Sequence, residues 1–214
     1  MTEHALWPWV TLSLLGGFHG INPGMGWLFA VALGMQEGNR RAVWQALLPL
    51  GLGHVLAVGA AILPAALAGI VIPVKWLRWP VAGTLLALGV YRLIRQRHPR
   101  WVGMRVGMKG LTLWSFLMAS AHGAGLMVLP VFLGMAAMSQ PNGQSGHLQG
   151  VEGPLAGLAA TLVHGAAYLL VTAVIALLAF EKFGLGLLRK AWINLDLIWA
   201  AALIATGVFT VALL

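Results

Sequence analysis

Long apolar runs separated by short polar connections dominate the chain. Six of them are about 20 residues long or longer, which is the length that a helix needs to cross the hydrocarbon core of a bilayer. The pattern predicts an all-α membrane protein with six transmembrane helices, at residues 7–35, 42–72, 76–93, 110–137, 154–180 and 191–214.

Composition supports this class. Hydrophobic residues make up 60% of the 214 and charged residues only 8%, too few to cover a water-soluble core of this size. The absence of cysteine excludes disulfides, thiolate ligands and thiol redox chemistry. We find no nucleophile–base pair, phosphate loop or zinc-protease motif, and therefore expect no enzyme.

Lys and Arg are concentrated in alternate connections between the apolar runs. Eleven lie in the first, third and fifth connections, and two, Lys75 and Arg78, lie on the opposite side. The positive-inside rule then predicts a multi-pass protein of the plasma (inner) membrane with both termini outside. This topology explains the net charge of +8 without a nucleic-acid partner. The polar stretch 139–153 reads as an external loop.

Two halves of the sequence resemble each other. Phe18-His19-Gly20 in the first run matches Ala121-His122-Gly123 in the fourth, and His54 in the second run has a counterpart, His164, in the fifth. Each half would hold three spans, an odd number, so the second copy must be threaded in the opposite direction. We expect a 3+3 inverted repeat, with residues 1–108 and 109–214 as its units.

Four histidines near the middle of four different runs are the main candidate site: His19, His54, His122 and His164. An ionisable side chain at this depth is costly and is by default a candidate for function. Neutral imidazole binds transition-metal ions and also carries protons near neutral pH. Each histidine could instead bond a backbone carbonyl of a neighbouring helix in packing.

The stretch 16–26 contains five glycines and Pro23, so the first run is not expected to be a continuous helix. Gly20, Pro23 and Gly24 are the predicted helix break. The carbonyl of His19, freed by Pro23, would form a cation site with the Asn22 amide, as broken helices do in transporters. The alternative is a kinked span whose small residues allow close packing.

Three further residues have two readings each. Met118 and Met127 are candidate soft ligands near His122, or ordinary apolar filling. Asp196, at the start of the last run, would couple protons or cap its helix.

The residues Asn22-Pro23-Gly24, Glu37-Gly38-Asn39-Arg40-Arg41-Ala42 and Gly51-Leu52-Gly53-His54 resemble the opening of lysine-exporter-type transporters. The resemblance covers the first 60 or so residues. It implies secondary transport, in a superfamily that includes amino-acid exporters, nickel/cobalt and cadmium efflux proteins and thiol-electron carriers. His19-Gly20 with Asn22 is similar to the His-rich first span of the nickel/cobalt branch, whose His-Asp pairs are absent here.

These observations predict an exporter of a small cation, specifically a transition-metal ion, through a midplane histidine site. Three alternatives remain open: an amino-acid exporter, an electron carrier with haem b between histidines, and an accessory subunit that scaffolds partners. The expected partners are the lipid bilayer and a small cation or small-molecule substrate. An oligomer or added subunits are compatible with the sequence.

Overall fold

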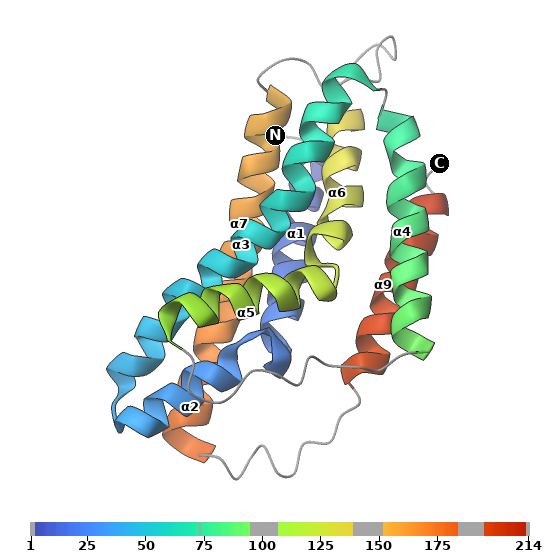
Figure 1. The fold of residues 1–214 in the computed structure, drawn as a ribbon. Coiled ribbons are helices and arrows are strands. Elements are labelled where there is room, and N and C mark those ends of the chain that lie inside the picture. Colours follow the sequence, from blue (N-terminus) through green and yellow to red (C-terminus); the bar gives the residue numbers. More distant parts are fainter. Residues whose placement is uncertain (1–2, 73, 95–106, 139–151, 184–194, 213–214) are drawn as a thin grey trace.

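Helices account for all the regular structure in the part of the chain that the computed structural model describes, residues 3–72, 74–94, 107–138, 152–183 and 195–212. The all-α class is therefore confirmed for these residues. In chain order the elements are α1 (Glu3–Ile21), the 3-10 turn η1 (Pro23–Met25), α2 (Trp27–Glu37), α3 (Arg40–Val71), α4 (Val74–Ile94), α5 (Met108–Ala121), α6 (Ala124–Met138), α7 (Glu152–Leu178), the π-helical turn η2 (Ala179–Phe183) and α9 (Leu195–Ala212) (Figure 1).

Two helical stretches, Arg40–Ala68 and Gly153–Lys182, are long and apolar enough to cross a membrane. A third candidate is the pair α5 and α6, if the two helices count as one bent span. The structure thus supports membrane association through two or three helices. The connections 95–106 and 184–194, with most of the predicted cytoplasmic cations, and the polar loop 139–151 lie outside the described residues.

The first predicted span is interrupted after Ile21. Pro23 begins η1, and the Asn22 side chain caps this turn by accepting a 2.8 Å hydrogen bond from the Gly24 N–H. Gly26 follows with φ of +133°, a conformation open to glycine and strained for other residues, and the chain then enters α2.

The fourth predicted span also differs from one straight helix, because α5 and α6 meet at an angle of 61°. Gly123, between them, has φ of +70° in the left-handed region. A left-handed residue ends the hydrogen-bond ladder of the preceding helix. The Gly123 carbonyl then accepts a 2.9 Å hydrogen bond from the Met127 N–H in the first turn of α6.

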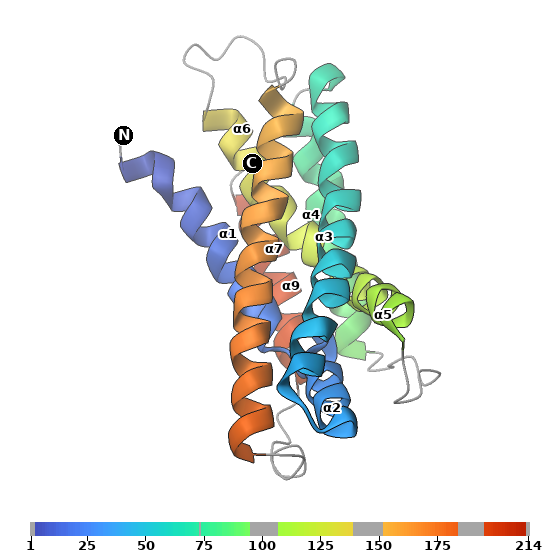
Figure 2. The ribbon, with the colours of Figure 1, turned by 90° about the vertical axis from the view of Figure 1, so that its left-hand side faces the viewer.

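Helices from the two halves of the sequence interleave. α3 and α7 pack side by side at the centre, α1 lies against α7, α5 crosses α3, and α4 pairs with α9 (Figures 1 and 2). At the contact of α1 with α7, a Cβ added to Gly16 would overlap the His164 carbonyl, and one at Gly20 would lie 2.7 Å from the Tyr168 carbonyl oxygen. Such close approach of backbones is typical of small-xxx-small seams in membranes.

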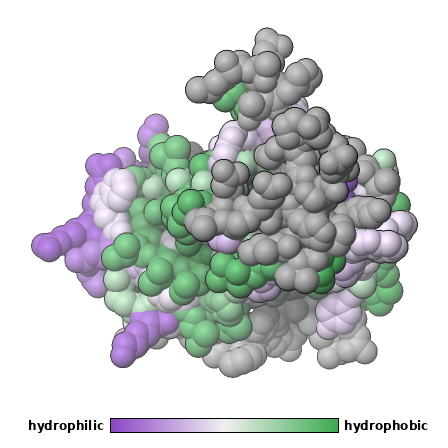
Figure 3. All heavy atoms as spheres, turned by 90° about the horizontal axis from the view of Figure 1, so that it is seen from above, coloured by the Kyte–Doolittle hydropathy of each residue, from purple (hydrophilic) through white to green (hydrophobic). Residues whose placement is uncertain are grey.

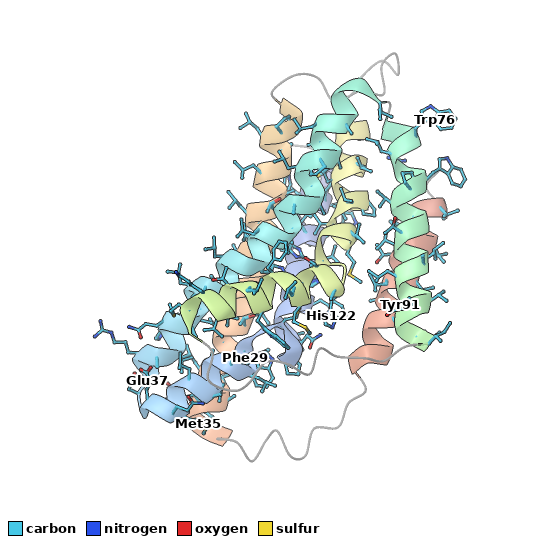
Figure 4. All side chains as sticks on the ribbon, in the orientation of Figure 1. Phe29, Met35, Glu37, Trp76, Tyr91 and His122 are labelled. Carbon is cyan, nitrogen blue, oxygen red and sulfur yellow. The ribbon has the colours of Figure 1, made fainter. Side chains whose placement is uncertain are left out.

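The outer surface is largely apolar, with side chains such as Leu48 and Leu170 73% and 66% exposed. Figure 3 shows hydrophobic side chains over much of one face and hydrophilic ones gathered at one edge. The six residues 36–41, from the end of α2 to the start of α3, are all exposed, and Arg40 pairs with Glu181 of η2 at 3.1 Å. Near the far end of the molecule, Trp76 points outward from the start of α4 (Figure 4). The arrangement suits a bilayer around the apolar part.

Asn39 begins the longest helix. Its side-chain oxygen accepts from the Ala42 N–H at 2.8 Å, which satisfies one of the unpaired donors in the first turn of α3. We expect Asn39→Ala to lower the free energy of unfolding by about 1 kcal/mol, measured by thermal unfolding in detergent. Asn39→Ser keeps a capping oxygen and should remain near the wild-type value; equal losses in both variants would contradict the cap.

Candidate functional site

Three of the four predicted histidines come together in the interior. His19 of α1, His54 of α3 and His164 of α7 are each 0% exposed. The ring centroids are 5.6 Å apart for His19 and His54, 5.1 Å for His19 and His164, and 5.3 Å for His54 and His164. These three residues, called the histidine cluster below, lie where α1 approaches the two central helices.

His122 lies at the bend between α5 and α6, as Figure 4 shows, and is buried. We describe it separately from the histidine cluster, whose three rings lie within 5.6 Å of one another.

The hydrogen bonds of the cluster fix which ring nitrogen carries the proton. His19 Nδ1 lies 2.7 Å from the Leu15 carbonyl oxygen, and His164 Nδ1 lies 3.2 Å from that of Leu12 on α1. A carbonyl only accepts, so in the neutral rings both Nδ1 atoms carry the hydrogen and both Nε2 atoms carry a lone pair.

The same argument applies to the remaining two rings. His122 Nδ1 lies 2.8 Å from the Met118 carbonyl oxygen, four residues earlier, as in the His19–Leu15 pair. His54 Nε2 lies 3.2 Å from His164 Nε2. Since His164 Nε2 is the acceptor, His54 donates through Nε2, and its Nδ1 is a buried acceptor without a partner.

Histidines that bind metal ions share a characteristic hydrogen bond at the second ring nitrogen. Metal-binding imidazoles almost always donate their other N–H to a backbone carbonyl or carboxylate, which orients the lone pair. His19, His122 and His164 are held in this way. Among the residues that the structure describes, however, no group of three or more His, Cys, Asp or Glu side chains is arranged to hold a metal ion as it stands.

A haem between two histidines does not fit the central pair. The His54 and His164 rings are nearly parallel, at 13°, and their Nε2 atoms lie 3.2 Å apart. Iron would need to sit at about 2 Å from each nitrogen with the macrocycle between the rings. Direct contact of the imidazoles leaves no space for that plane.

The other predicted residues have varied surroundings. Asn22 serves as the cap of η1, and the His19 carbonyl accepts the Asn22 backbone N–H at 3.3 Å, so both groups of the predicted cation site have protein partners. Met118 is buried, with its Cε near Gly24. Met127 packs with Leu85 and Leu203 in an apolar cluster. Asp196 lies in the first turn of α9, and its side chain is outside the described part of the chain.

Sequence reasoning missed a set of buried hydroxyl groups around the cluster. On α7, Thr161, Tyr168 and Thr172 share a buried face with His164, at spacings of three and four residues. Ser115 of α5 donates to the Leu50 carbonyl of α3 at 2.6 Å. The helical spacing on α7 was the available signal for three of these four residues.

We found no protein-family model, curated protein or solved structure that matches this chain.

Proposed function

We propose that the protein is an integral membrane secondary transporter that exports a small cation, specifically a divalent transition-metal ion, by way of the histidine cluster. The observation that carries the proposal is the convergence of three fully buried imidazoles from three helices beside an interrupted helix. Intramembrane ionisable groups and broken helices mark ion pathways in transporters.

The central pair supplies two ligands that need little rearrangement. Two nitrogens bound tetrahedrally to one ion at about 2.0–2.1 Å lie roughly 3.3 Å apart. His54 Nε2 and His164 Nε2 are 3.2 Å apart. An ion entering between them would take the place of the shared proton, and a turn of the His19 ring would bring a third nitrogen to it.

Binding of the ion and movement of a proton are linked at His54. Its Nε2 hydrogen must leave, or pass to Nδ1, before that nitrogen can bind a cation. Protonation of the cluster would conversely release the ion. Cation–proton exchange is therefore the coupling that we propose.

Six spans in a 3+3 inverted repeat would allow this transporter an outward-open and an inward-open state, related by movement of one repeat against the other. In support, α1 and α5 both end at a break beside a histidine that bonds the carbonyl four residues back, and α1 packs on α7 as α5 packs on α3. The central contact of α3 with α7 and the outer contact of α4 with α9 would each lie on the pseudo-twofold axis. The Arg40–Glu181 pair would lie at the cytoplasmic side, in keeping with the predicted topology.

An amino-acid exporter is the rival within this class, and one observation favours it. α6 begins at Ala124, directly after His122 and Gly123, so its first N–H groups follow His122 at the bend. A helix N-terminus in that position attracts a substrate carboxylate.

Flux into proteoliposomes tests the proposal. We expect wild-type protein to move Ni²⁺, Co²⁺ or Zn²⁺ in exchange for protons when a proton gradient is imposed. The variant with alanine at His19, His54, His122 and His164 should lose flux by about tenfold or more. His147→Ala, in the predicted external loop, is the matched control and should keep wild-type flux. Unchanged flux in the fourfold variant would refute the metal mechanism, and amino-acid flux without metal flux would favour the rival.

A further inference from the structure

Aromatic side chains hold the backbone carbonyls of the interrupted segment. Trp27 Nε1 donates to the Ile21 carbonyl at 3.0 Å, Trp114 Nε1 to that of Gly24 at 3.3 Å, and the Tyr168 hydroxyl to that of Met25 at 2.7 Å. Carbonyls that lose their helical partners in an apolar interior need such donors.

Tyr168 differs from the two tryptophans because it also contacts the histidine cluster. Its ring stacks on His54 with centroids 3.8 Å apart and planes 11° apart. The side chain is fully buried on α7, one turn after His164. Tyr168, on a helix of the second half, therefore connects the interrupted segment of the first half to His54, whose ring donates a hydrogen bond to His164.

We propose that Tyr168 is a positioning residue that latches the segment 22–26 onto α7 and thereby closes access to the histidine cluster from that side. The latch is the Tyr168–Met25 hydrogen bond, and its release frees the segment to move about Gly26, whose φ of +133° only glycine tolerates well. A single neutral hydrogen bond is weak enough to open and close repeatedly. The role as a gate rests on the proposed transport function, but the latch itself can be tested without a substrate.

The absence of cysteine makes a direct test available. Gly24→Cys introduces a thiol into the segment, where an added Cβ would meet only the Asn22 oxygen at 3.3 Å and the Met118 Cε at 3.4 Å. Labelling of this thiol by a membrane-impermeant maleimide, in vesicles of both orientations, reports access to the segment.

We expect slow labelling in the Gly24→Cys background, and labelling from one side that is several-fold faster when Tyr168→Phe is added. Phenylalanine keeps the stacked ring on His54 and removes only the hydroxyl. The matched control is Thr161→Val, which removes another buried hydroxyl of α7 whose hydrogen bond, to the Gly157 carbonyl at 2.8 Å, stays within the helix. This control should label at the background rate.

Amide hydrogen exchange of the segment in the cysteine-free chain gives a second measurement if Gly24→Cys does not fold. Tyr168→Phe should exchange several-fold faster there and Thr161→Val should not. Unchanged rates in Tyr168→Phe, or equal increases in both variants, would overturn the latch. If wild-type flux is absent while Tyr168→Phe opens the segment, transport fails and the latch stands; if histidine-dependent flux is present and the segment does not open, only the latch fails.

Discussion

Valine at position 16 is expected to force α1 and α7 apart and to leave little folded protein. A Cβ on Gly16 would overlap the His164 carbonyl, which belongs to a helix backbone and cannot turn aside as a side chain can. Overpacking commonly costs about 1–3 kcal/mol, and a rigid obstacle places this site at the upper end or above. We expect Gly16→Val to lower the free energy of unfolding by more than about 3 kcal/mol in a detergent-based unfolding titration.

A second glycine provides the control for Gly16→Val. Gly83 lies within α4, and a Cβ added there would meet nothing within 4 Å. Alanine at Gly83 should leave stability unchanged or raise it by about 0.5–1 kcal/mol, because glycine is a poor helix former. A Gly16→Val protein as stable as wild type would show that α1 and α7 do not meet as closely as described.

Alanine at Gly26 is expected to damage both stability and the histidine cluster. The φ of +133° costs a non-glycine residue about 1–3 kcal/mol, and the new Cβ would lie 2.5 Å from Leu50 Cδ2. We expect a total loss of about 2–4 kcal/mol in the same titration, together with weaker binding of the proposed metal ion by the purified protein, because the segment next to His19 must shift.

Gly38→Ala is the control that separates the cost of a positive φ from the overlap with Leu50. Gly38 also has a positive φ, +63°, but a Cβ there would lie in open space. Gly38→Ala should lower the free energy of unfolding by only about 1 kcal/mol, without a change in binding of the proposed metal ion. Equal losses at both positions would contradict the contact of Gly26 with Leu50.

Helix positions could be predicted from the sequence because apolar runs of bilayer length leave few other structures. α3 and α4 each begin and end within two residues of the predicted runs. The bend between α5 and α6 could not be predicted, because Gly123 is one of 28 glycines. Only the fold shows that it has a positive φ and that a Cβ added there would lie 2.8 Å from Leu203 Cδ2.

The histidine cluster could likewise be predicted in part, and its hydrogen-bond partners could not. Depth in different apolar runs predicted that four histidines converge, and the structure brings the rings of His19, His54 and His164 together. The partners of the freed carbonyls were not foreseen, because the donors Trp114 and Tyr168 come from helices far along the chain. The sequence alone does not show which group donates a hydrogen bond to a carbonyl near Pro23. In the fold the donor is the N–H or O–H of an aromatic side chain.

The contact between His164 and the Leu12 carbonyl joins residues 152 positions apart. At ribosomal rates of about 5–20 residues per second, α1 would wait roughly 8–30 s in the membrane before α7 is synthesised. During that interval Gly16 and Gly20 of α1 lack the α7 backbone that they pack against in the folded protein. Biogenesis of this protein would thus depend on lipids, the insertion machinery or a chaperone to cover this face of α1 until α7 has been synthesised.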